Sequence, residues 1–262
     1  MKLHDTRGLR VQGMSASFEE RIVLENVTFS VQAGQIVGVI GLNGSGKTTL
    51  LRSIACLQKH SGVCVLNGVE LETVSVWERS KLIGYCAAQP EIPSGITCLE
   101  TVLTGLSSRL GLFRQATAEQ EQAAIKKLSL VGLADMAERE LQTISGGQRR
   151  LVLLARAMVH NPSLLLLDEP DGPLDFTHRK SMMTLLHTFA QESGCCVVIT
   201  SHDVNSMLNY ADRLLLLRNG HLIGNVNCVD SAAAELEDTL SRIYGPVRLL
   251  QNGCTYVMTE KI

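Results

Sequence analysis

One glycine-rich segment near residue 45 combines residue types that could hold a phosphate group. It reads Gly41-Leu42-Asn43-Gly44-Ser45-Gly46-Lys47-Thr48-Thr49, after a β-branched run at 36–40 and before an apolar, helix-like run at 50–55. Glycines let successive N–H groups converge on an anion, and the start of a helix adds partial positive charge. Lys47 would reach the β- and γ-phosphates of a nucleotide, and the Thr48 hydroxyl would ligate Mg²⁺. A chance match of this pattern arises in about one chain in a hundred of this length, so we predict a nucleotide site.

Two carboxylates and one histidine follow predicted buried strands. Asp168 and Glu169 end the run Ser163-Leu164-Leu165-Leu166-Leu167, and His202 ends the run that starts at Cys195-Cys196. Parallel strands of an α/β sheet bind ligands at their carboxyl ends, so these side chains should meet there. Asp168 suits Mg²⁺, Glu169 could deprotonate an attacking water, and His202 could contact the γ-phosphate. The alternatives are charges that cap a buried strand and a structural histidine.

A second potential anion site begins another predicted helix. Its residues are Ser145-Gly146-Gly147-Gln148, where Ser145 is placed to cap the helix and the glycines leave N–H groups uncovered. An ordinary helix cap is the alternative. The arginines that follow, Arg149, Arg150 and Arg156, we expect to be solvated or structural rather than catalytic.

An aromatic residue and a glutamine lie at the ends of other predicted strands. Phe18 precedes the break at Glu19-Glu20-Arg21, and Gln89 ends the strand-like run from residue 82. Phe18 could stack on a purine or fill a hairpin core, and spacing alone favours the hairpin core.

Composition excludes some classes of protein. The 262 residues are 45% hydrophobic, enough for a large core, while a net charge of -2 and 4% aromatics argue against nucleic-acid binding. The eight cysteines form no C-x-x-C pair and indicate reduced, partly buried thiols in a cytosolic protein. No signal peptide and no apolar run of about 20 residues is present, so we expect any membrane role to require a partner.

Local patterns outline the remaining chain. Residues 7–35 alternate as strands of a small antiparallel sheet, and Asn67-Gly68 and Asn252-Gly253 indicate hairpins. Residues 97–157 have a helical pattern throughout, with an apolar face continued by Leu110 and Phe113, and a charged helix from 118 to 130. Residues 231–244 predict a short helix.

With these residues together, the chain resembles the ATP-binding subunit of ABC transporters. The segments that match the family motifs are 41–48 (Walker A), Gln89 (Q-loop), 145–148 (signature), 164–169 (Walker B), Leu174-Asp175 (D-loop) and His202 (switch histidine). Phe18 stands where the family has its adenine-stacking aromatic, which reverses the preference given above.

The resemblance implies an α/β fold: a P-loop NTPase (RecA-like) core with an N-terminal antiparallel β subdomain and an inserted α-helical signature subdomain. We expect one domain over 1–262, with the core in 1–89 and 158–225, the helical subdomain in 90–157 and an extension in 226–262. It also implies ATP hydrolysis by Glu169, His202, Gln89 and Lys47. Thr48, Gln89 and Asp168 would bind Mg²⁺.

The resemblance further implies partners. Two copies would pair head to tail, with ATP between the Walker A loop of one and the signature of the other. Integral membrane permease subunits would dock on residues 89–113, at the cytoplasmic face of the inner membrane, and an extracytoplasmic substrate-binding protein would act indirectly. Three segments are similar to importers of metal chelates (ferric siderophores, haem or cobalamin): Pro93-Ser94-Gly95-Ile96-Thr97, Leu174-Asp175-Phe176 and Ile243-Tyr244-Gly245.

Some residues depart from the family pattern. Asp171-Gly172-Pro173 replaces the usual threonine and polar residues of the D-loop, adding a charge and a fixed φ near the expected interface. Ile144 replaces a usual leucine and Phe18 a usual tyrosine. Another transport class, a regulatory module without turnover, and a relative acting in translation or DNA repair are the alternative functions.

Overall fold

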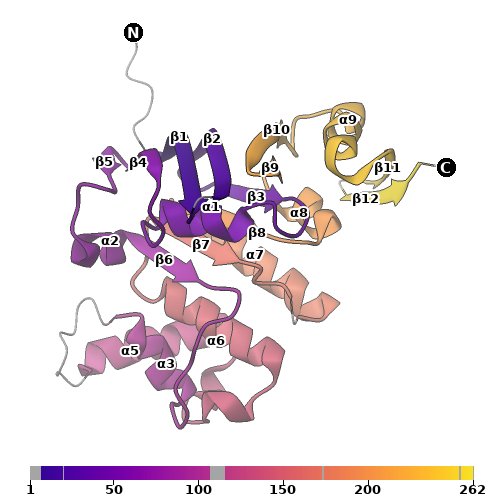
Figure 1. Ribbon diagram of the computed structural model, residues 1–262. Helices are drawn as coiled ribbons and strands as arrows, with labels where there is room; N and C mark the ends of the chain where they lie inside the picture. Colours follow the sequence, from indigo (N-terminus) through magenta and orange to yellow (C-terminus); the bar gives the residue numbers. More distant parts are fainter. Residues whose placement is uncertain (1–6, 20, 107–115, 173, 254, 262) are drawn as a thin grey trace.

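The computed structural model describes residues 7–19, 21–106, 116–172, 174–253 and 255–261 (Figure 1). Its centre is a six-stranded sheet in the order β10-β9-β3-β8-β7-β6. The parallel strands are β3 (Ile36–Ile40), β6 (Ile83–Cys86), β7 (Leu164–Asp168), β8 (Cys196–Thr200) and β9 (Arg213–Arg218), and β10 (His221–Asn227) pairs antiparallel with β9. Every residue of β3, β7 and β8 is buried, as continuous apolar runs predict for strands covered on both faces.

A second, antiparallel sheet has the order β2-β1-β4-β5. It consists of β1 (Gly8–Phe18), β2 (Arg21–Gln32), β4 (Ser61–Leu66) and β5 (Val69–Glu70), so the predicted small sheet and the hairpin at Asn67-Gly68 are confirmed. Helix α1 (Lys47–Ile54) packs between the two sheets, and its Leu50 and Leu51 share one core with residues of both. This core fixes the start of α1 relative to both sheets.

Three helices pack together on one side of the central sheet (Figure 1). They are α3 (Cys98–Thr104), α5 (Ala118–Leu130) and α6 (Gly146–Met158). The bounds of α5 confirm the predicted charged helix, but the expectation of helix throughout 97–157 is wrong. The chain turns at Gly132 (φ 74°) and forms only two 3-10 turns, η1 (Ala134–Met136) and η2 (Leu141–Thr143), before α6. Leu110 and Phe113 lie outside the described residues.

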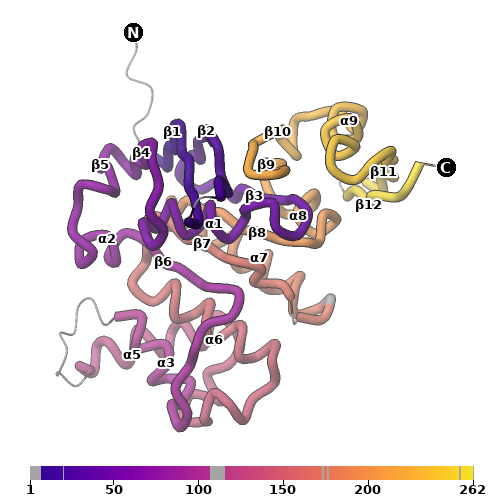
Figure 2. Tube along the Cα trace, in the orientation of Figure 1, coloured from indigo at the N-terminus to yellow at the C-terminus, as the bar shows by residue number. Residues whose placement is uncertain are grey.

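Four further helices complete the described chain: α2 (Val76–Leu82), α7 (Phe176–Ser193), α8 (Val204–Tyr210) and α9 (Ala233–Tyr244). The predicted helix near 231–244 is α9, and the predicted terminal hairpin is β11 (Val247–Asn252) with β12 (Thr255–Glu260). Figure 2 traces this C-terminal segment in yellow, beside the β10 edge of the central sheet.

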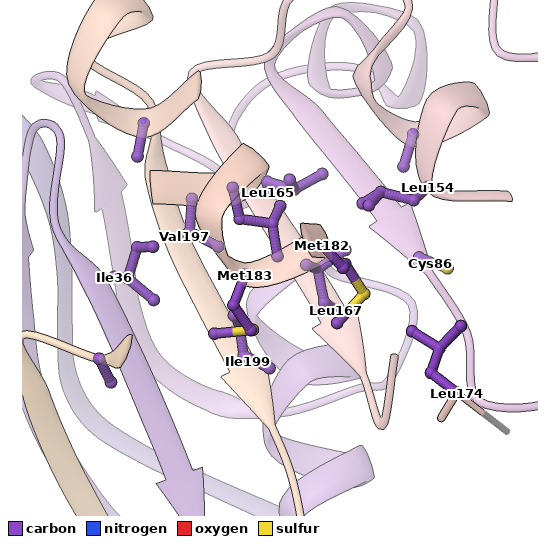
Figure 3. Close-up of a cluster of buried hydrophobic side chains, with 14 of the residues drawn as sticks. Ile36, Cys86, Leu154, Leu165, Leu167, Leu174, Met182, Met183, Val197 and Ile199 are labelled. Carbon is purple, nitrogen blue, oxygen red and sulfur yellow. The ribbon is translucent and has the colours of Figure 1, made fainter. Parts of the chain in front are cut away.

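Helix α7 covers strands β7 and β8 and was not predicted. Its Met182 and Met183 pack against Leu165, Leu167 and Ile199 (Figure 3). Burying each such side chain contributes about 1.5–3 kcal/mol, which holds the helix on the sheet. The strand ends that carry the acidic residues are therefore fixed from one face by α7.

The described cysteines are all free thiols, as predicted, and Cys254 lies outside the described residues. Within the described part of the chain, no helix is both long and apolar enough to cross a bilayer.

Candidate nucleotide site

The loop between β3 and α1 adopts a conformation that requires glycine. A Cβ on Gly41 would lie 2.2 Å from the Leu217 carbonyl oxygen, and Gly46, at φ 105°, would place one 2.9 Å from the Val23 carbonyl oxygen. Gly44, at φ 75°, differs because a Cβ there would meet nothing within 4 Å. The loop is thus tightly packed on its protein side at Gly41 and Gly46 and open at Gly44.

A hollow of about 190 Å³ lies over this loop. Its lining residues come from the loop, β2 and the ends of the central strands: Val23, Asn43, Gly44, Ser45, Gly46, Lys47, Thr48, Thr49, Glu169 and His202. The structure therefore brings most of the predicted phosphate-binding residues to one place, together with Glu169 and His202.

Two polar side chains of the loop are suited to a polyphosphate. Ser45 Oγ is buried and has no hydrogen-bond partner among the described residues. Lys47 Nζ donates to the carbonyl oxygens of Gly41 at 2.8 Å and Leu42 at 3.3 Å. Burial lowers the pKa of Lys47, while the charges of Glu169 and Asp168 act in the opposite direction. An anion in the hollow would supply the partner that Ser45 lacks and a stronger acceptor for Lys47.

Hard oxygen donors lie beside the loop where a Mg²⁺ ion would bind. Thr48 Oγ1 lies 3.2 Å from Asp168 Oδ1, and Thr200 Oγ1 donates to the same oxygen at 2.7 Å. Asp168 is only 1% exposed and does not line the hollow, so it reaches the site through Thr48. This donor set fits Mg²⁺, which prefers few protein oxygens and keeps its waters. Gln89 is exposed and does not line the hollow, so its role as a ligand stays a prediction.

Glu169 and His202 form a pair at the rim of the hollow. Their side chains approach to 2.5 Å, from Glu169 Oε1 to His202 Nε2. The Glu169 backbone has φ 48°, and its N–H donates to Thr200 Oγ1 at 3.0 Å, which aims the carboxylate away from the buried strand. This conformation is rare for glutamate and, with Glu169 lining the hollow, favours a role in the site over a charge that only caps β7.

The signature residues do not line the hollow over the phosphate loop. Ser145 is the exposed N-cap of α6, and its Oγ accepts from the Gln148 N–H at 3.2 Å, while Gln148 Oε1 accepts from the Ser145 N–H at 3.1 Å. The amide of Gln148, which belongs to the predicted anion-binding segment, is therefore already paired. Gly146 instead lines a separate hollow of about 580 Å³ with Ala88 and Pro90.

Phe18 is 59% exposed at the end of β1. This exposure excludes the hairpin-core role and leaves the side chain accessible to a ligand.

Arg150 has a structural role that the sequence did not reveal in detail. The residue is 5% exposed, and its guanidinium donates to five carbonyl oxygens of two chain segments: Ala87 and Ala88, and Asp168, Glu169 and Pro170. Arg150, five residues after Ser145 on α6, thus connects this helix to the backbone next to Gln89 and to the backbone of Glu169. The expectation of a structural arginine is confirmed here.

Asp171 has a structural role that the sequence did not reveal. Its side chain is buried and accepts a hydrogen bond from Ser201 Oγ at 2.7 Å, while its position near an interface stays a prediction. The Asp203 N–H donates to the same Ser201 oxygen at 2.9 Å. Asp171 therefore holds the loop that carries His202. Pro173 lies outside the described residues.

Comparison with known proteins agrees with this geometry. A family model described as ABC transporter matches residues 24–172. The ferric enterobactin transport ATP-binding protein FepC of Escherichia coli is 31% identical, over 90% of this chain and 87% of its own length. The phosphonates import ATP-binding protein PhnC of Frankia casuarinae is 32% identical, over 92% and 98%.

Solved structures give the same result. The dimeric structure of the ABC transporter cassette MJ0796 has a TM-score of 0.75 at 28% identity, covering 84% of this chain and 98% of its own. A structure described as a metal-chelate type ABC transporter in an inward-facing conformation has a TM-score of 0.80 at 25% identity, covering 96% of both chains.

Proposed function

This chain belongs to the ABC transporter family as an ATP-binding ATPase subunit that uses Mg²⁺, and we propose that two copies enclose ATP between them to power the import of a metal chelate. The observation that carries the proposal is the incomplete pocket. Lys47, Glu169 and His202 line one hollow, whereas Ser145 caps a helix elsewhere and is exposed. A head-to-tail partner would bring its own Ser145 to the γ-phosphate, and MJ0796 is an example of a dimeric cassette.

In the proposed reaction, each residue acts from its observed position. Lys47 would leave the carbonyls of Gly41 and Leu42 and donate to the β- and γ-phosphates. Glu169 would accept a proton from water as the water oxygen bonds to the γ-phosphorus and the bond to the bridging oxygen breaks, giving ADP and phosphate. His202 would hold Glu169 in place and contact the γ-phosphate. Mg²⁺, when bound by Thr48 and Asp168, supplies positive charge beside the phosphate oxygens.

We propose that the hollow of about 580 Å³ next to Gln89 receives the permease. Ala88, Pro90 and Ile92 from the chain after β6 line it with Gly146 and Arg149 of α6, so a segment seated there would contact both parts. The docking region predicted over 89–113 contributes Pro90 and Ile92 to this hollow, and its end, 107–113, lies outside the described residues. In this proposal residues 90–157 act as the helical subdomain, 226–262 as an extension, and the dimer is peripheral at the cytoplasmic face of the membrane.

The substrate class rests on narrower support. FepC is named a ferric enterobactin transport ATP-binding protein, and the segments at 93–97, 174–176 and 243–245 are similar to chelate importers. Since PhnC, a phosphonate importer, is equally similar, relatedness alone does not separate the two substrate classes. The net charge of -2 remains an argument against the alternative role on ribosomes or DNA.

The direct test is transport by a reconstituted complex. The permease that co-purifies with this chain is placed in vesicles with its external binding protein, and uptake of a ferric siderophore, cobalamin and a phosphonate is compared, with a Glu169→Gln chain as the inactive control. ATP-dependent uptake of a metal chelate supports the proposal. Uptake of the phosphonate alone would refute the substrate class but not ATP-driven import, and ATP turnover that never responds to a permease would favour the regulatory module.

A further inference from the structure

A thiol, an imidazole and a carboxylate meet beyond the C-terminal end of α1, outside the nucleotide hollow. Cys56 follows α1, His60 precedes β4, and Glu72 follows β5. One ligand atom from each of these side chains lies within 4.8 Å of those of the other two. Sulfur, nitrogen and oxygen donors from two connections, one between α1 and β4 and one after β5, therefore lie close together.

The spacing of these atoms is close to that of a metal-ligand shell. His60 Nε2 lies 3.6 Å from Glu72 Oε1. Metal bonds of about 2.0–2.3 Å in a tetrahedral site place two ligand atoms about 3.3–3.8 Å apart. The histidine and the carboxylate thus already have the required separation, and the thiol sulfur, within 4.8 Å of both atoms, would need to approach by at most about 1.5 Å.

The histidine is held in the orientation that a metal ligand needs. The His60 side chain is 4% exposed, and its Nδ1 lies 3.2 Å from the Ser61 carbonyl oxygen. A carbonyl only accepts hydrogen bonds, so a proton on Nδ1 would satisfy this contact and leave Nε2, the atom nearer Glu72, free to bind a metal. A second-shell hydrogen bond of this kind is typical of metal-binding histidines.

The charges around the site also permit a cation. Glu72 accepts from the Cys64 N–H at 2.9 Å, which fixes its carboxylate. Burial raises the pKa of Cys56, so a metal would displace a thiol proton on binding. The positive charge of Arg79 partly offsets this rise in the pKa of Cys56. The Arg79 guanidinium itself donates to the Leu71 and Val74 carbonyls at 3.0 and 3.1 Å. A divalent ion with one thiolate and one carboxylate is neutral, so Arg79 opposes it little once bound.

We propose that Cys56, His60 and Glu72 form a binding site for a divalent cation of the zinc type. Thiolate and imidazole ligands favour such borderline ions and disfavour Mg²⁺ and Ca²⁺. The site lies apart from the Mg²⁺ donors Thr48 and Asp168, and its existence does not depend on the transported substrate.

Occupation of this site would connect α1 to the antiparallel sheet. Helix α1 starts at Lys47 of the phosphate loop and ends just before Cys56, while His60 leads directly into β4. In the same turn, Gln58 Nε2 donates to the Ser17 carbonyl oxygen at 3.4 Å, next to Phe18. A metal ion would therefore stabilise the junction between the phosphate-loop helix and the sheet that carries the aromatic residue.

The test measures zinc binding to the full chain, reduced, without nucleotide and without a histidine tag. Zinc is titrated in competition with a chromophoric chelator, and Co²⁺ is used as a spectroscopic probe. The wild-type chain should bind one ion, with a thiolate-to-cobalt charge-transfer band. Cys56→Ser and His60→Gln should each weaken binding by at least about tenfold and Cys56→Ser should abolish the band. Zinc should raise the melting temperature of the wild type but not of these variants.

A matched control comes from His221 and Glu25. Their atoms lie 3.5 Å apart, as close as those of His60 and Glu72, but the described residues place no thiol with them in a three-ligand group. His221→Gln should leave zinc affinity unchanged. Zinc affinity that is the same in the wild type, Cys56→Ser and His60→Gln would overturn the proposal and leave His60 and Glu72 as an ordinary ion pair. Should His60→Gln unfold, Cys56→Ser alone decides, because its shape is nearly unchanged.

Discussion

Replacing Arg150 by methionine tests how the two halves of the site are held together. Methionine keeps most of the apolar stem but loses every donor of the guanidinium. The carbonyls that lose their partner belong to Ala87, Ala88, Asp168, Glu169 and Pro170, at 2.7, 3.0, 2.5, 2.7 and 3.3 Å. A single hydrogen bond to a charged group contributes about 1.5–3 kcal/mol to stability. The contributions of several bonds to one guanidinium do not add, and removing one partner of a buried charged contact costs about 3–5 kcal/mol in total. We therefore expect Arg150→Met to lower the free energy of unfolding by about 4 kcal/mol.

Urea unfolding followed by circular dichroism measures this loss, and the neighbouring arginine is the control. Arg149 donates to the Leu141 and Gln142 carbonyls at 3.3 and 3.2 Å from a partly exposed position. Arg149→Met should therefore cost less than about 1 kcal/mol. Arg150→Lys should fall between the two, since a single ammonium cannot bind all the carbonyls of both segments at once. Equal free energies of unfolding for Arg150→Met and Arg149→Met would refute the reasoning.

Three further changes test other parts of the structure. Glu169→Gln should retain ATP affinity in a fluorescent-nucleotide titration but release phosphate at least about a hundredfold more slowly, and undiminished turnover would exclude Glu169 as the base. Gly44→Ala and Gly46→Ala both force alanine to positive φ, which costs about 1–2 kcal/mol. Only at position 46 would the new Cβ also lie 2.9 Å from the Val23 carbonyl oxygen, so Gly46→Ala should be the less stable variant in urea unfolding. The reverse order would contradict the loop geometry. Burial raises the pKa of Cys195 to about 12 and that of Cys196 to about 11, from an ordinary value near 9. As the pH rises above 9, the unfolded chain therefore loses thiol protons that the folded chain keeps. The free energy of unfolding should therefore fall from pH 9 to 11, and Cys196→Ala should reduce the slope by about 1.4 kcal/mol per pH unit; an unchanged slope would refute the assignment to this thiol.

Much of the fold could be predicted because its signals are local. The apolar runs of β3, β7 and β8, the hairpin at Asn67-Gly68 and the charged helix α5 each have a characteristic pattern within a few residues. Helix α7 had signals too and was missed. Asp175 caps its start by accepting from the His178 N–H at 2.9 Å, Gly194 ends it at φ 68°, and Met182, Leu186 and Ala190 repeat at helical spacing.

The rest of the site could not be predicted because its contacts join distant segments. Arg150 lies 63 residues after Ala87 and 18 residues before Asp168, and no local pattern reveals that their backbones share one guanidinium. The same holds for Asp171 with Ser201, which lie 30 residues apart. Motif spacing identified Lys47, Glu169 and His202, whereas the side chains that hold them depend on the folded chain.

The central claim is that one chain contains only part of a working nucleotide site. Its most direct test is light scattering of the Glu169→Gln chain with ATP, compared with the double variant Glu169→Gln, Ser145→Arg. We expect the first to double in mass when ATP is added, and the second to bind ATP while it remains a single chain. The account would be contradicted by a strictly monomeric protein that hydrolyses ATP at full rate and is unaffected by Ser145→Arg.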